Sequence, residues 1–171
     1  YAIYTVRELQ MGNLLETFKP LLDNDKVRKI ALQALANSPT KSDDEYLKSL
    51  TTQKDSISDD LLGCFFESKN VENLKFCLEL LKTKKVSDDY YFSVSKNKLI
   101  YSDELLPYVQ SALKECKNEK VIGELVRALQ NRDDAESTNI LIGFLKHKDS
   151  SVRYWSAVAL QGNKNQKVIT S

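Results

Sequence analysis

ILIGFLKHKDSSVRYWSAVALQG, residues 140–162, is the stretch that decides the predicted fold. Apolar side chains recur at spacings of three, four and seven residues before and after a short polar turn, residues 146–149. These spacings place one apolar stripe along each of two helices. Because a lone helical hairpin cannot cover both stripes, the stretch predicts that similar hairpins pack against it.

The bulk composition is that of one globular domain. The chain has 171 residues, of which 42% are hydrophobic and 29% charged, and this size suffices to bury a core. Lys and Arg number 25 and Asp and Glu 24, so the net charge is +1. That balance disfavours nucleic acid or an anionic membrane surface as the partner. No apolar run approaches the roughly 20 residues that cross a bilayer, so no membrane association is expected.

Cysteine usage and the first residues indicate a cytoplasmic protein. The three cysteines form no CxxC pair, so we expect free thiols in a reducing compartment. Arg7 and Glu8 interrupt the first ten residues, which argues against a signal peptide. Tyr1 stands where a start Met is expected, so we expect the chain to lack a few residues or to be an excised piece.

The second helix of the hairpin recurs along the chain. VRKIALQAL begins at Val27, VIGELVRAL at Val121 and VRYWSAVAL at Val152, and each places Ala-Leu seven and eight residues after the Val. Weaker copies begin at Ile57 and Val86. Successive starts lie about 30 residues apart, a spacing typical of helical repeats. The pattern predicts an all-α protein with five such second helices.

A first helix precedes each of these starts. The predicted first helices cover residues 14–22, 43–52, 71–81, 104–116 and 135–146, and residues 1–10 are predicted to form one further helix. Ser42 with Glu45 fits a capping box at one helix start. Ser58, Ser87 and Ser102 each follow an apolar residue and precede an acidic pair, which predicts N-cap serines.

The two ends of the chain resemble short, bacterial-type HEAT repeats. The segments that carry the resemblance are LLDNDKVRKIALQALAN and FLKHKDSSVRYWSAVALQG. The HEAT pattern of Asp in the turn and V-R…A…A-L in the second helix is matched by Asp25 or Asp23, Val27, Arg28, Ala34 and Leu35, and by Asp149, Val152, Arg153, Ala159 and Leu160. The copy at Val121 has Ile122 where Arg is expected. The resemblance implies a right-handed α-solenoid of about five HEAT-like hairpins, a single domain over residues 1–171, with the second helices on the concave face.

Residues that would indicate catalysis are few. His147 is the one histidine, and it lies in a turn without a cluster of metal ligands. Cys64, Cys77 and Cys116 fall on core stripes or helix ends, so packing is the simplest role for them. Some HEAT proteins are iron hydroxylases with His-Glu pairs, and this chain has none. No Gly-rich phosphate loop is present. We expect no catalytic, cofactor or metal site.

Polar and aromatic residues on the second helices are the candidates for partner binding. The acidic pairs Asp59-Asp60 and Asp88-Asp89 suit either helix capping, the favoured interpretation, or a patch for a basic partner. Basic residues flank this acidic middle, a mixture that suits a protein better than a phosphate backbone. Aromatic residues on a groove can anchor protein interfaces or stack bases. The expected groove residues are Arg28, Lys29, Asp59, Asp88, Tyr91, Phe92, Arg127 and Tyr154.

The predicted function is therefore a non-enzymatic scaffold that captures a protein partner on its concave face. It would act as an adaptor or as an inhibitor, such as an immunity protein that neutralises a toxin. The alternative is a DNA-binding or DNA-glycosylase-like HEAT protein, for which Trp155, Arg153 and several Asp residues are available. A phycobilin lyase-type role is allowed by the resemblance alone. Tyr154-Trp155 replaces Lys29-Ile30 of the first copy, so a function local to the last hairpin is expected there.

Overall fold

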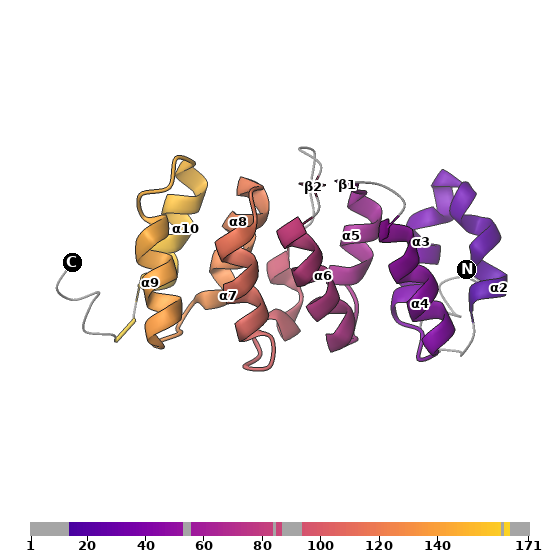
Figure 1. The fold of residues 1–171 in the computed structure, drawn as a ribbon, viewed down its shortest axis with the longest axis horizontal. Coiled ribbons are helices and arrows are strands. Elements are labelled where there is room, and N and C mark those ends of the chain that lie inside the picture. Colours follow the sequence, from indigo (N-terminus) through magenta and orange to yellow (C-terminus); the bar gives the residue numbers. More distant parts are fainter. Residues whose placement is uncertain (1–13, 53–55, 84, 87–93, 162, 165–171) are drawn as a thin grey trace. The chain divides into compact units, whose positions relative to one another are not determined.

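The computed structural model describes residues 14–52, 56–83, 85–86, 94–161 and 163–164, and their regular structure is almost entirely helical (Figure 1). The α-helices are α2 (Leu15–Phe18), α3 (Asp25–Ala36), α4 (Lys41–Ser49), α5 (Asp59–Phe66), α6 (Val71–Thr83), α7 (Leu106–Glu115), α8 (Glu119–Val126), α9 (Ala135–Phe144) and α10 (Ser150–Leu160). The short 3-10 turns are η1 (Lys19–Asp23), η2 (Leu50–Thr52), η3 (Val94–Lys96), η4 (Lys98–Tyr101) and η5 (Arg127–Leu129). The all-α prediction is confirmed, apart from two strands of two residues each. The helix predicted for residues 1–10 lies outside the described residues.

The chain divides into two compact units. Unit 1 comprises residues 1–77 and 84–89, and unit 2 comprises residues 78–83 and 90–171. In unit 1, α2 packs on α4 and α3 packs on α5. In unit 2, α7 packs on α9 and α8 packs on α10. Within each unit, therefore, first helices contact first helices and second helices contact second helices.

An Asn or Asp side chain starts each of the three best-preserved second helices. Asn24 accepts a hydrogen bond from the Lys26 amide at 3.1 Å, and Asn118 accepts one from the Val121 amide at 3.1 Å. Asp149 accepts one from the Val152 amide at 3.0 Å. Each cap satisfies a backbone donor that the helix cannot satisfy itself. In the first copy the cap is thus Asn24, and neither Asp23 nor Asp25 fills that place.

The Ala-Leu positions of the repeat lie in the core. Ala34, Leu35, Ala128, Leu129, Ala159 and Leu160 are all buried, as are Cys64 and Phe65 in the weaker copy. The same backbone hydrogen bond follows each copy. The amide three residues after the Leu position donates to the carbonyl oxygen of the Leu position. This bond joins Ser38 to Leu35, Ser68 to Phe65, Asn97 to Val94, Arg132 to Leu129 and Asn163 to Leu160, with N–O distances of 3.0–3.3 Å. The turn that follows each of the five predicted copies thus closes in the same way.

Buried polar side chains join these turns to the next helix. Ser38 donates to the Asp43 carboxylate, and Asn73 donates to Ser68 Oγ at 3.4 Å, each pair being five residues apart. The capping box predicted at Ser42 is wrong, because α4 begins at Lys41 and Ser42 lies in its first turn. Asp43 instead points inward and binds the backbone amides of the first described residues, Leu14 and Leu15.

Two of the predicted second-helix starts are strand residues. β1 (Ser56–Ile57) pairs in parallel with β2 (Lys85–Val86), with Ile57 opposite Val86. Both β-branched side chains are buried, which favours the pairing. The Ser58 N-cap is confirmed, since Ser58 Oγ accepts from the Leu61 amide and α5 begins at Asp59. Ser87, which was predicted as the N-cap of the next copy, lies outside the described residues.

Candidate functional site

Two places, one in each unit, hold three of the described residues that the sequence nominated. Arg127 and Tyr154 both contact Trp155 in unit 2, and Arg28 lines a pocket in unit 1. Of the other predicted groove residues, Lys29 and Asp59 are described, and Asp88, Tyr91 and Phe92 lie outside the described part of the chain.

The site in unit 2 is built around Trp155, and we call Arg127, Tyr154 and Trp155 the Trp155 patch. The Arg127 guanidinium carbon lies 4.4 Å from the centre of the Trp155 ring. The Tyr154 ring meets the Trp155 ring edge-on at a centroid distance of 5.1 Å. Tyr154 is 61% exposed, whereas Trp155 is half-buried. The Tyr154 phenol is therefore exposed, and it is supported by the Trp155 ring, which the Arg127 guanidinium holds in place.

Helix periodicity explains why these side chains face outward. Val152, Ser156 and Ala159 are buried on the core side of α10, so Tyr154 projects to the opposite side. The packing of α8 on α10 brings Arg127, which follows α8 directly, over the indole. Gly123 also lies close to the indole, since a Cβ built there would be in ordinary van der Waals contact with Trp155 Cδ1, at 3.9 Å. A larger side chain at that position would meet the indole.

The charged side chains next to the Trp155 patch mostly form local contacts. Arg153 donates to the carbonyl oxygens of His147 and Lys148, both at 2.8 Å, and so closes its own turn. Lys148 pairs with Glu119 at 2.6 Å. Their hydrogen bond raises the pKa of Lys148 and lowers that of Glu119. Both groups therefore stay charged near neutral pH.

His147 serves the same turn. Its Nδ1 accepts a hydrogen bond from the Asp149 amide at 3.1 Å, and its ring packs edge-on against Phe144 at 5.8 Å. Among the described residues, no three His, Cys, Asp or Glu side chains lie close enough together to hold a metal ion. These contacts agree with the structural role expected for His147.

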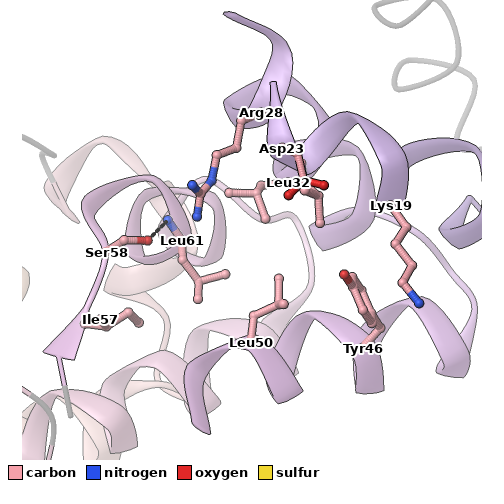
Figure 2. Close-up of a pocket in the computed structure, with 10 residues that line it drawn as sticks. Lys19, Asp23, Arg28, Leu32, Tyr46, Leu50, Ile57, Ser58 and Leu61 are labelled. Carbon is pink, nitrogen blue, oxygen red and sulfur yellow. Dashed lines mark hydrogen bonds between the residues drawn. The ribbon is translucent and has the colours of Figure 1, made fainter. Parts of the chain in front are cut away.

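The site in unit 1 is a pocket of about 340 Å³ between η1, α3, α4, η2 and the start of α5 (Figure 2). The lining residues are Lys19, Leu22, Asp23, Arg28, Leu32, Tyr46, Leu50, Ile57, Ser58 and Leu61. Figure 2 shows Arg28 reaching from α3 into the space above Leu61. Lys29 is exposed and does not line the pocket. Asp59 occupies the first turn of α5, where the positive end of the helix dipole stabilises a carboxylate.

The cysteines are packed in the core. Cys64 and Cys77 are fully buried and Cys116 is 8% exposed. Burial raises the pKa of all three thiols above the ordinary value. A protonated thiol is a poor nucleophile, so the burial of the three cysteines supports the packing role.

Comparison with family models, with curated proteins and with solved structures found no match to this chain. None of the helices in the described ranges is long and apolar enough to span a bilayer.

Lys19, Asp23 and Tyr46 are site residues that the sequence did not nominate. They come from a 3-10 turn and a first helix, whereas the expected groove was built from second helices alone. Periodicity identifies which side chains are buried, but it carries no signal for a gap left between several elements.

Proposed function

We propose that this chain is a non-enzymatic binding protein that contacts a protein partner through the Trp155 patch. The exposure of Tyr154 on the stacked Arg127–Trp155 pair is the observation that carries the proposal. Trp, Tyr and Arg are the residues in which interface binding energy concentrates. Because Trp155 is held from both sides, little side-chain entropy would be lost when a partner docks on Tyr154.

The wider architecture that we propose is a right-handed solenoid of about five HEAT-like hairpins. The hydrogen bond shared by the five repeat turns and the helix layers within each unit support it. In such a protein the second helices, which include α10, form the concave binding face. The free thiols of the three cysteines support a cytoplasmic location.

The partner that the patch fits best is a protein with an acidic rim around an apolar centre. Arg127 forms a long ion pair with Glu124, at 3.4 Å, and remains partly exposed. Its guanidinium can therefore also receive a carboxylate of the partner. Both roles named from the sequence, adaptor and inhibitor of the immunity-protein kind, use such a surface.

A nucleic-acid partner receives less support. Base-stacking platforms offer successive open ring faces. Here the Arg127 guanidinium covers one face of Trp155, and Tyr154 is the exposed ring of the pair. The net charge of +1 also gives little attraction to phosphates. The glycosylase-like alternative therefore ranks second.

The test compares capture of host proteins by the wild-type chain, Tyr154→Ser and a control, Tyr101→Ser. Tyr101 is another exposed tyrosine of unit 2 and lies outside the patch. We expect one protein to be enriched by the wild type and the control, and to fall about tenfold or more with Tyr154→Ser. Equal recovery with all three chains, or enrichment that disappears after nuclease treatment, would refute the proposal.

A further inference from the structure

The pocket in unit 1 has an apolar floor and a charged rim. Leu32, Ile57 and Leu61 are buried against the core, and the half-buried Leu22 and Leu50 complete the floor. Arg28, Lys19, Asp23 and Tyr46 bring polar groups to the same space. Its volume of about 340 Å³ is that of a small ligand site.

Arg28 is the unusual member of the rim. Its Nε atom is buried and has no hydrogen-bond partner among the described residues. A buried donor without a partner lowers stability, so this geometry is more favourable once an acceptor enters the pocket. A carboxylate matches the fork of a guanidinium best, because it can accept two parallel hydrogen bonds.

The rest of the rim selects the charge of the ligand. The Lys19 ammonium packs over the Tyr46 ring at 5.4 Å, and Asp23 adds one negative charge. Two cations and one carboxylate leave a single positive charge, which suits a monoanion better than a phosphate. Burial and the Asp23 charge raise the pKa of Tyr46, so its hydroxyl remains a hydrogen-bond donor.

We propose that the pocket in unit 1 binds a single carboxylate carried on an apolar group, with Arg28 holding the carboxylate and Leu50, Ile57 and Leu61 covering the apolar part. Two sources carry this chemistry, namely a peptide C-terminus that ends in an apolar residue and a free aliphatic acid. The site lies in the other unit from the Trp155 patch and does not depend on that patch's function.

The first test needs no variant. The full chain, labelled at its isoleucine methyl groups, is titrated with octanoate, octanol and octylamine and followed by NMR. We expect a saturable shift of the Ile57 methyl with octanoate, and affinities about tenfold or more weaker for the alcohol and the amine. The Ile100 methyl, buried in unit 2, should not move.

A short peptide ending in Leu, with a free or an amidated C-terminus, separates the two sources. Binding of the free peptide alone assigns a peptide C-terminus, and binding of octanoate alone assigns an aliphatic acid. Either result supports the proposal. Equal binding of the octyl compounds, or no saturable shift with either octanoate or the free peptide, would overturn it.

Variants then locate the site. Arg28→Gln should weaken the carboxylate about tenfold or more, whereas Lys26→Gln, which removes a charge from an exposed site on the same helix, should leave binding unchanged. Leu50→Phe, which fills the pocket and keeps its charges, should also weaken binding if Arg28→Gln fails to fold. Tyr154→Ser should bind as the wild type does. Undiminished binding by folded Arg28→Gln would contradict the role assigned to Arg28.

Discussion

Asp43 is a charged side chain with no exposed surface. Its carboxylate accepts hydrogen bonds from the amides of Leu14 and Leu15, at 2.8 and 2.9 Å, and from the Ser38 hydroxyl. We expect Asp43→Ala to lower the free energy of unfolding by about 3 kcal/mol, because it leaves buried donors without an acceptor. Urea unfolding measures the change.

The matched control for Asp43 is Glu45→Gln on the same helix. Glu45 is exposed and pairs with Lys41 at the surface, so the expected change is within about 0.5 kcal/mol. A similar small effect for Asp43→Ala would contradict the structural role of the buried carboxylate.

Asp43 and Asp134 make the stability depend on pH. Burial by itself would raise the pKa of each carboxyl, but hydrogen bonds to each ionised form outweigh it and lower the pKa. A folded-state pKa below the unfolded one stabilises the protein above that unfolded pKa, and the stabilisation is lost as pH falls through the folded value. We expect a steady urea midpoint from neutral pH down to about 5 and a decline below about 4. Asp43→Asn should make that decline shallower, and an unchanged slope would exclude Asp43 as its source.

Single residues of the candidate sites were predictable only in part. Tyr154, Arg127 and Arg28 follow from the repeat register, since the frame shows which positions of a second helix face away from the core. The stacking of Arg127 on Trp155 depends on how α8 packs on α10, which periodicity does not give. The buried role of Asp43 was not predicted, because sequence alone does not show which turn a carboxylate faces.

Helix caps set the boundaries at the scale of elements. Asp149 accepts hydrogen bonds from the amides of Ser151 and Val152, at 2.9 and 3.0 Å. We expect Asp149→Ala to cost about 1 kcal/mol, because two first-turn donors of α10 lose their acceptor. Asp149→Asn keeps an acceptor and should cost less than half as much. Thermal unfolding compares them, and equal losses would show that the charge rather than the cap stabilises the helix.

Most helices were predicted from their apolar stripes, and the start expected near Ile57 lies just before α5. Ile57 and Val86 continue the repeat spacing, but both are β-branched and pair as strands. The Ser58 cap fixes the start of α5 after Ile57. The period in the sequence therefore gave the spacing of the expected copies, while local capping chemistry decided where α5 begins.

At the scale of the whole molecule, the two units each have buried cysteines that can report on local opening. Cys64 and Cys77 belong to unit 1 and are fully buried, and Cys116 belongs to unit 2. In the proposed stacked-repeat architecture, stability is a sum of local terms, so a defect in one repeat opens its neighbours first. We therefore expect the two units to respond separately to a destabilising substitution.

Thiol labelling with iodoacetamide, read by peptide mass spectrometry, measures this response in the native protein. Asp43→Ala should accelerate labelling of Cys64 and Cys77 by about 100-fold, in line with a loss of about 3 kcal/mol, and change that of Cys116 far less. Leu125→Ala, which removes a buried side chain of α8 in unit 2, should do the reverse. Each thiol reacts only after the structure around it opens, because burial both shields the sulfur and raises the pKa of the thiol. Equal acceleration of all three cysteines by both substitutions would mean that the chain opens as one cooperative body, and it would count against the repeat architecture.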